Sequence, residues 1–202
     1  MKKIMFNDRF ALTEAVIEGR KTMTRRIVGN RMTEGDIKAY LKGYTELANK
    51  CAPYKIGEVV AVAQNYHDVY KELKRTHGSS SRVTREFFHK YVQGGRMPVS
   101  NKMFVRADLM LYQIRITNIK VEKLQDISEE DCLNEGVYYD ADVDGYKVFN
   151  LFLPNKGWGH KFRQTYFQTP REAFAALIDK ILGKGTWKSN PFVFAYTFKF
   201  PK

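Results

Sequence analysis

The sequence predicts an α+β fold, with helices inserted between strands that come from distant parts of the chain. Two observations predict it. Apolar or alternating segments typical of strands lie far apart, at residues 58–64, 112–121 and 192–200. Other segments have apolar residues at helical spacing, begin with capping residues and end at glycine. A doubly wound parallel fold fits poorly, because it would need regular strand–helix alternation and a glycine-rich phosphate turn. The strands favour a small mixed barrel.

The first part of the chain contains two predicted strands and two predicted helices. Residues 3–6 are predicted to form a short strand, and the helix that follows it ends at Gly19, the residue type that most often ends helices. A second helix is predicted over residues 33–50. The segment 58–64 is rich in valine and alanine, which is typical of a buried strand.

Residues 66–101 are predicted to be an irregular insertion with a short helix around 86–92, because glycine, serine and proline interrupt the apolar pattern. The segment 69–106 carries nine Lys or Arg against two Glu, a net charge of +7. Scattered cations among flexible glycines are expected of an arm that contacts phosphates. A loop that only improves solubility fits the same composition.

The middle of the chain is predicted to form a bulged strand. Apolar residues alternate from Tyr112 to Ile116 and then change phase at Ile119, which a β-bulge near Asn118 explains most simply. A short helix is predicted to begin after Ser128 and to end at Gly136.

The last part of the chain contains a second predicted insertion and a strongly predicted helix. Residues 137–168 form an irregular stretch of aromatic residues among glycines and charges. The sequence Thr169-Pro-Arg-Glu172 is a capping box with proline at the first helical position, and the helix that it starts ends at Gly183. The aromatic residues of 192–200 alternate, so one face of the final strand is expected to point inward.

The composition predicts one folded domain over residues 1–202. The chain is 44% apolar and 14% aromatic, which is enough to form a hydrophobic core. No apolar run approaches the roughly 20 residues of a membrane span, and the basic start Met1-Lys2-Lys3 is not followed by the apolar region of a signal peptide. A cytoplasmic protein is expected. Cys51 and Cys132 lack metal-ligand spacing and are expected to be reduced.

The net charge is +12, from 34 basic and 22 acidic residues, which favours a polyanionic partner. The charge is unevenly distributed: residues 122–144 carry nine Asp or Glu against one Lys, a net of −8. An acidic segment therefore lies within a basic protein.

The segment Glu18-Gly-Arg-Lys-Thr-Met-Thr-Arg-Arg26 holds the greatest density of reactive and hydrogen-bonding groups. One interpretation is a solvated basic loop whose threonines bond to nearby backbone groups. The other is a binding or catalytic site. A lysine whose pKa is lowered by burial or by neighbouring arginines can accept a proton, so Lys21 would activate the hydroxyl of Thr24 as a nucleophile.

This segment, together with Gly57-Glu-Val-Val, the stretch from Leu124 to Gly136, and Asn190-Pro-Phe-Val-Phe before the last strand, resembles the ASCH family. The resemblance implies a PUA-like mixed β-barrel with peripheral helices, here with two irregular insertions, and a role in binding nucleosides or RNA. The matching motifs are spread over almost the whole chain but account for about half of it.

Within that family, the local similarity is greatest to small bacterial amidohydrolases that act on N4-acetylcytidine. That similarity implies catalytic roles for Lys21 as proton acceptor, Thr24 as nucleophile and Glu135 as proton donor. Glu129 and Glu130 lie close enough to take the place of Glu135 in the alignment. The chain is about twice the length of those enzymes, so the substrate can differ.

Other candidate residues complete the predicted site. Arg26, or a backbone N–H, is a candidate for holding an oxyanion, and Gln64 and Tyr66 lie directly after a central strand, where an amide and a ring can recognise a base. For Tyr66, packing in the core fits equally well. The four histidines show no metal-ligand spacing, so no metal and no cofactor are expected.

Three functions are consistent with these residues. The first is hydrolysis of the N4-acyl amide of a modified cytidine. The second is noncatalytic binding of single-stranded RNA, with basic loops holding phosphates. The third is ribonuclease activity, because the same side chains can serve phosphodiester cleavage. The sequence gives no oligomeric state.

Overall fold

The computed structural model describes residues 1–94, 99–154 and 162–201. The chain forms two compact units. Unit 1 consists of Met1–Phe6, Val59–Ile114 and Phe200–Lys202, and unit 2 consists of Asn7–Glu58 and Arg115–Lys199.

Unit 1 combines two short strands with a helical segment. Its regular elements are β1 (Lys3–Ile4), β3 (Val59–Val62), α4 (Tyr66–His77), α5 (Arg82–Phe87), a π-helical turn (Phe88–Val92), two 3-10 turns (Lys102–Phe104 and Ala107–Leu109) and the first two residues of β4 (Gln113–Lys123). The strands β1 and β3 are parallel, with the Ala61 N–H donating to the Lys2 carbonyl over 2.9 Å.

Unit 2 holds the rest of β4 and most of the other strands. Its N-terminal elements are a 3-10 turn (Asp8–Phe10), α1 (Leu12–Ile17), β2 (Met23–Ile27), a 3-10 turn (Gly29–Arg31), α2 (Glu34–Leu41) and α3 (Glu46–Cys51). Its C-terminal elements are a 3-10 turn (Leu124–Asp126), α6 (Glu129–Asn134), β5 (Tyr138–Asp140), β6 (Gly145–Lys147), β7 (Phe152–Pro154), β8 (Phe162–Gln164), α7 (Pro170–Leu182), α8 (Thr186–Ser189) and β9 (Phe192–Lys199).

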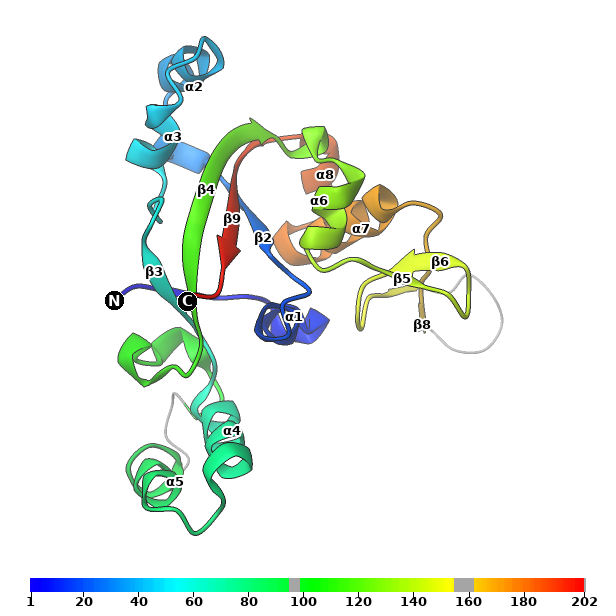
Figure 1. The fold of residues 1–202 in the computed structure, drawn as a ribbon. Helices are drawn as coiled ribbons and strands as arrows, with labels where there is room; N and C mark the ends of the chain where they lie inside the picture. Colours follow the sequence, from blue (N-terminus) through cyan, green and yellow to red (C-terminus); the bar gives the residue numbers. More distant parts are fainter. Residues whose placement is uncertain (95–98, 155–161, 202) are drawn as a thin grey trace. The chain divides into compact units, whose positions relative to one another are not determined.

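The main sheet is mixed and has the strand order β1-β3-β4-β9-β2 (Figure 1). The strands β4 and β2 are both antiparallel to β9, which lies between them. Thr24 of β2 lies opposite Tyr196 of β9, which in turn lies opposite Ile119 of β4. The register between β4 and β9 shifts between Ile116 and Asn118, which confirms the bulge predicted from the change of phase. The α+β class is also confirmed.

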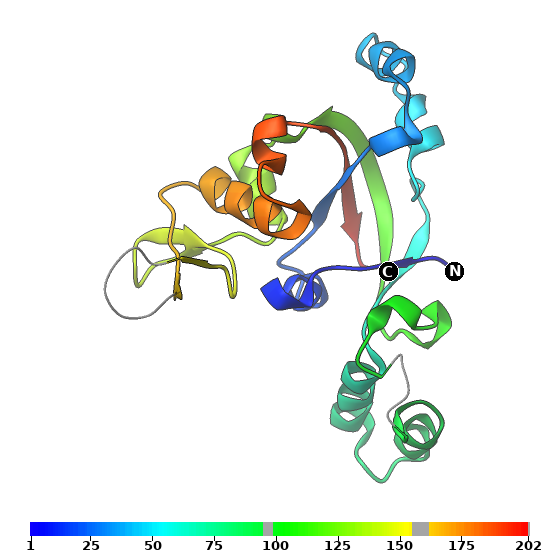
Figure 2. The ribbon, with the colours of Figure 1, turned by 180° about the vertical axis from the view of Figure 1, so that it is seen from behind.

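The helices α6 and α7 of unit 2, which matter most for the site, lie on the β2 side of β4 and β9 in both views (Figures 1 and 2). The helix α7 begins with the predicted capping box, formed by Thr169 and Glu172. It buries Phe174, Leu177 and Ile178 on one face. The helix α6, which precedes β5, contacts both α7 and β2. These contacts place its C-terminal end beside the start of β2.

The expectations of a closed barrel, of one helix over 33–50 and of an irregular stretch over 137–168 need correction. No pairing between β1 and β2 occurs within the described ranges, so the sheet is open and the expected closed barrel is not formed there. The helix expected over 33–50 is two helices, because the chain turns at Gly43, whose φ is +109°. Residues 137–168 contain two hairpins, β5–β6 and β7–β8, with residues 155–161 outside the described part.

The insertion at 66–101 is helical rather than irregular over the residues that the structure describes. Asn65 caps α4 by accepting from the Asp68 N–H, and the buried residues Tyr66, Val69 and Leu73 recur at helical spacing. They pack with Phe87 of α5 in a core of their own. None of the helices within 1–94, 99–154 and 162–201 has the length and hydropathy that a membrane span requires.

Candidate functional site

The segment that precedes β2 is held in place by its own backbone. The helix α1 ends at Ile17 with Glu18 as its C-cap, and the chain reverses at Gly19, whose φ of +77° strains any residue with a Cβ. The Lys21 N–H then donates to the Ala15 carbonyl over 2.9 Å. The Thr22 N–H donates to the carbonyl of Asn134 over 2.9 Å, so the start of β2 lies against the end of α6.

Lys21 and Glu135 meet in the interior although 114 residues separate them. The Lys21 ammonium donates to Glu135 Oε2 over 2.6 Å and to the Glu135 backbone carbonyl over 2.7 Å. The side chains are 2% and 5% exposed. The next residue is Gly136, with a φ of +103°, and a Cβ there would lie 3.1 Å from Leu12 Cδ2. Glycine is therefore required where the chain passes the lysine.

Arg25 completes a buried network of charges around Glu135. Its guanidinium donates to Glu135 Oε1 over 3.2 Å, to Glu122 Oε1 over 2.6 Å and to Asp131 Oδ2 over 2.6 Å. The Lys120 ammonium lies 2.7 Å from Glu122 Oε2. We call these residues the buried ion network: Lys21, Arg25, Lys120, Glu122, Asp131 and Glu135.

Three cations and three carboxylates balance within this network, and because Lys120 is largely exposed the balance limits the cost of burying the other groups. Burial lowers the pKa of Lys21, an effect that Glu135 opposes and that Arg26 and Arg25 reinforce. Burial also lowers the pKa of Arg25, but Glu135, Asp131 and Glu122 outweigh it and the pKa is raised. Of the two basic side chains Lys21 and Arg25, Lys21 is therefore the one that releases its proton more readily.

Thr24 and Arg26 point to the other face of β2. Successive residues of a strand point to opposite faces, and Arg25 directs its side chain toward Glu135. Thr24 is 5% exposed and lies opposite Tyr196 in the register with β9. The structure thus brings Lys21 and Glu135 into contact and places Thr24 on the opposite face from Arg25.

Aromatic hydroxyl groups lie on the Thr24 face. Tyr196 is fully buried, and its hydroxyl makes no hydrogen bond within the described residues. Burial raises the pKa of Tyr196. The rings of Tyr54 and Tyr196 meet edge to face, with centroids 5.6 Å apart. Burial likewise raises the pKa of Tyr54, while the positive charge of Arg26 lowers it.

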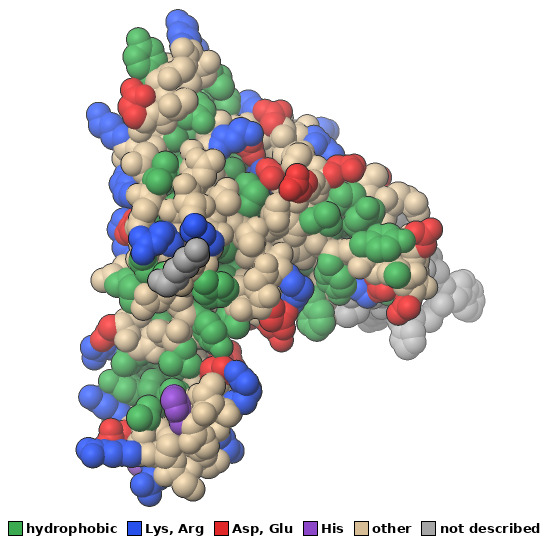
Figure 3. Space-filling view, viewed as in Figure 1, with side chains coloured by type: hydrophobic (Ala, Val, Ile, Leu, Met, Phe, Trp, Pro, Cys, Tyr) green, Lys and Arg blue, Asp and Glu red, His purple; other side chains and the backbone are tan. Residues whose placement is uncertain are grey.

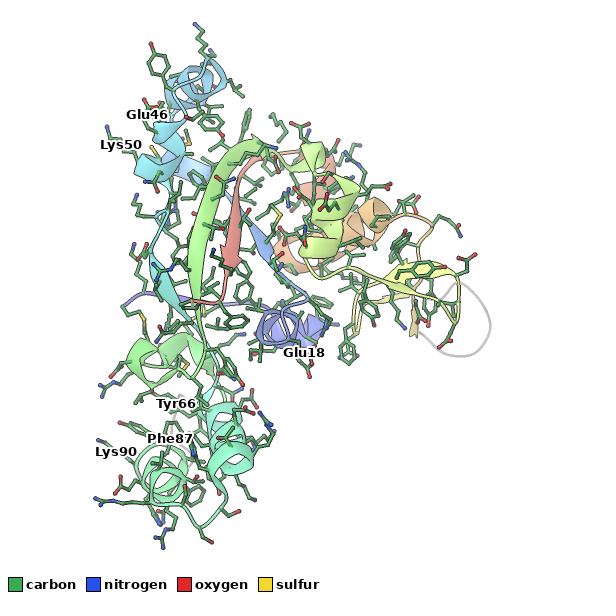
Figure 4. The ribbon with its side chains drawn as sticks, in the orientation of Figure 1. Glu18, Glu46, Lys50, Tyr66, Phe87 and Lys90 are labelled. Atoms are coloured by element: carbon green, nitrogen blue, oxygen red, sulfur yellow. The ribbon has the colours of Figure 1, made fainter. Side chains whose placement is uncertain are left out.

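The two candidates from unit 1 have other surroundings. Tyr66 is 3% exposed, its ring packs edge to face on Phe87, and its hydroxyl accepts from the Arg106 N–H over 3.1 Å (Figure 4). Tyr66 is therefore a core residue, which was the second of its two predicted roles, and its ring is not accessible for stacking on a base. Gln64 is 7% exposed and its N–H donates to the Met110 sulfur over 3.2 Å. Gln64 Oε1 has no hydrogen-bond partner in the described part of the chain.

The remaining sequence candidates are excluded from the network. Glu129 and Glu130 are exposed at the start of α6, so Glu135 is the glutamate of this stretch that contacts Lys21. Cys132 is a free, buried thiol whose pKa burial raises to about 12. Over the described residues, no group of three or more His, Cys, Asp or Glu side chains is placed to hold a metal ion.

Sequence reasoning missed four members of the network, namely Arg25, Lys120, Glu122 and Asp131. Arg25 had a signal, because it lies within the dense segment next to the more prominent Thr24. Glu122 had none, because its burial beside Val121, in a strand otherwise buried at alternate positions, shows only in the structure. A charged residue at a buried strand position predicts a partner charge.

Comparison with known proteins gives no match for this chain among family models, curated proteins or solved structures. What the site does is therefore argued from its own geometry.

The buried ion network predicts that replacing Glu135 lowers the unfolding free energy much more than replacing Glu129 does. Glu135→Gln removes a carboxylate from two buried cations, and breaking such a pair costs about 3–5 kcal/mol of unfolding free energy. Glu129→Gln, on the exposed start of the same helix, is expected to change it by no more than about 0.5 kcal/mol. Equilibrium denaturation in urea measures both. Equal effects of the two variants would refute the network.

Proposed function

We propose that unit 2 is an ASCH-type domain that binds a nucleoside, free or within single-stranded RNA, beside β2. The observation that supports this most directly is the buried contact of Lys21 with Glu135 at 2.6 Å. These are the two residues, far apart in sequence, that the family resemblance pairs in one site. The PUA-like architecture is part of the same proposal, supported by the bulged β4 and the antiparallel set β4, β9 and β2.

The groups on the Thr24 face suit recognition of a base. Thr24 and Tyr196 carry hydroxyl groups that donate or accept, Arg26 carries a positive charge, and Tyr54 presents an aromatic ring. Proteins recognise single nucleosides by stacking on aromatic rings and by hydrogen bonds to the base edge. Within the buried ion network, the bonds of Arg25 to Glu122 and Asp131 would hold β2 in position beneath the ligand.

Hydrolysis of an N4-acyl amide is the chemistry that we assign to this domain. Thr24 Oγ1 would attack the acyl carbon while the neutral amine of Lys21 takes the hydroxyl proton. The bond from the acyl carbon to N4 then breaks, and Glu135 gives the leaving amine the proton that it took from the Lys21 ammonium when that amine became neutral. Water releases the acid from Thr24. The lowered pKa of Lys21 supports its role as base.

This step requires a rearrangement. The Lys21 ammonium is engaged by two oxygen atoms of Glu135, and a base must come within hydrogen-bond reach of the proton that it takes. Binding of the substrate would therefore have to turn the Lys21 amine toward Thr24.

Acetate release from N4-acetylcytidine tests the enzyme, and calorimetry with the same compound tests binding. We expect wild-type protein to bind the nucleoside and to release acetate. Thr24→Val should keep binding and lose at least about 10²-fold in rate, because the nucleophile is removed. Thr22→Val is the matched control, since its hydroxyl bonds to Asn134 outside the proposed chemistry, and it should keep the rate.

The outcomes separate the alternatives. Binding without acetate release in the wild type would leave a noncatalytic nucleoside-binding module. Cleavage of an RNA oligonucleotide that Thr24→Val abolishes would make the protein a ribonuclease. No binding of either nucleoside or RNA would contradict the proposed function.

A second candidate, RNA binding through the helical segment of unit 1, is supported by the charges on α4, α5 and the π-helical turn. Figure 3 shows Lys and Arg side chains around α4 and α5. Several of these cations are neutralised by neighbouring carboxylates, as Arg75 is by Glu72 at 2.6 Å. Within the described residues, Lys74, Arg85 and Lys90 are exposed and form no ion pair within 4.0 Å, although the charge of Lys90 acts on nearby Glu86.

These three cations determine how strongly the affinity for RNA is expected to depend on salt concentration. Replacing Lys74, Arg85 and Lys90 with glutamine should reduce the slope of log Kd against log salt by about 2, since each phosphate contact with a single strand contributes about 0.7. Affinity for an RNA oligonucleotide measured between low and moderate salt checks this. Arg75→Gln is the control, because Arg75 is already paired, and it should change the slope less. An unchanged slope in the triple variant would exclude this surface.

A further inference from the structure

The helix α4 of unit 1 lies against α5 and the π-helical turn that follows it (Figure 1). Thr84 Oγ1 of α5 donates to the Leu73 carbonyl of α4 over 3.3 Å. One turn further, the rings of Tyr70 and Phe88 meet with their centroids 5.1 Å apart. The contacts move backward along α4 as they advance from α5 into the π-helical turn, so the two segments are antiparallel. We call them the helical pair.

Phe88 belongs to the surface of the helical pair rather than to its core. The preceding residue, Phe87, is 9% exposed and packs on Tyr66 in the core of unit 1. Phe88 is partly exposed, and its ring contacts Tyr70, which is also partly exposed, and the exposed His89. The rings of Tyr70 and Phe88 therefore present aromatic surface to solvent on one side of the helical pair.

Two exposed cations flank these rings. Lys74 follows Tyr70 by four residues, so it lies one turn away on the same side of α4. Arg85 precedes Phe88 by three residues and lies one turn from that ring on the same side of α5. Neither cation forms an ion pair within 4.0 Å among the described residues. Because the two rings meet, the two cations lie on one side of the helical pair.

The carboxylates of the helical pair lie on its other side. Residues 66–94 contain three of them, Asp68, Glu72 and Glu86. Each is two residues from Tyr70 or Phe88, and residues two apart on a helix do not face the same way. Each also has a cationic partner within 4.0 Å, namely Lys71, Arg75 and Arg82 respectively. The side that carries the two rings is therefore positive, with no carboxylate from these helices.

We propose that this side of the helical pair binds single-stranded RNA, with an unpaired base stacked on Phe88 beside Tyr70. Lys74 and Arg85 contact the phosphates on either side of that base. The inference rests on the second candidate function, RNA binding by unit 1, to which it adds the face that contacts RNA and the need for unpaired bases.

The aromatic rings select a single strand over a duplex. In duplex RNA the bases stack on one another, and side chains cannot read the deep, narrow major groove. In a single strand each base has a free face that can stack on an aromatic ring, largely independently of its sequence. Cations alone would attract any polyanion, including an acidic peptide, so the contribution of the bases is what distinguishes RNA as the partner.

Fluorescence anisotropy with the full chain compares two labelled oligomers, decauridylate and an abasic decamer with the same ribose–phosphate backbone. We expect the wild type to bind decauridylate at least about fivefold more tightly, which is the smallest gain that stacking of one base provides. Phe88→Ala should remove this advantage and leave the affinities for the abasic decamer and for a ten-pair RNA duplex unchanged. Phe88→Trp should restore it. Phe104→Ala is the matched control, since Phe104 is 56% exposed elsewhere in unit 1.

The salt dependence separates stacking from charge on the same oligomers. Phe88→Ala should lower the affinity for decauridylate without changing the slope of log Kd against log salt, because stacking releases no counterions. Lys74→Gln should instead reduce the slope by about 0.7.

Each contrary result has its own meaning. Equal affinity of the wild type for the two decamers, or binding of decaglutamate as tight as that of decauridylate, would overturn the stacking face and leave binding by charge alone. An affinity for decauridylate that is unchanged in Phe88→Ala, folded by circular dichroism, would overturn it by placing the bases elsewhere on the chain. No binding of either decamer would remove RNA binding by unit 1 and the stacking face with it.

Discussion

The Glu135 carboxylate is the group on which the arrangement of unit 2 depends. One of its oxygens accepts from Lys21 and the other from Arg25, and all three side chains are almost fully buried. Buried cations are tolerated only when carboxylates compensate them, so the end of α6 is obliged to lie against the start of β2. Arg25 extends the same requirement to Glu122 on β4 and thereby ties two strands and a helix together.

Both faces of this part of the sheet follow from that requirement. With Arg25 fixed toward α6, Thr24 and Arg26 must project to the opposite face, beside Tyr54 and Tyr196. Glu122 also connects the network to Lys120 on the same strand, because its second oxygen lies 2.7 Å from the Lys120 ammonium.

The sequence predicted those features that depend on local pattern. The bulge, the capping box at Thr169 and the pairing of Lys21 with Glu135 could all be predicted, the first two from periodicity and capping chemistry and the third from a family resemblance. The helix α4 was missed although Tyr66, Val69 and Leu73 have helical spacing, because the glycines and serines that follow suggested a loop. Long-range partners such as Glu122 have no local signal, since their role depends on which strands become neighbours.

A double-mutant cycle between Lys21 and Glu135 tests the central claim most directly. The unfolding free energies of wild type, Lys21→Met, Glu135→Gln and the double variant give the coupling between the two side chains. Direct contact in a buried network predicts a coupling of about 1–3 kcal/mol. Additivity within about 0.5 kcal/mol would contradict the account, because it would mean that the two residues do not interact in the folded protein.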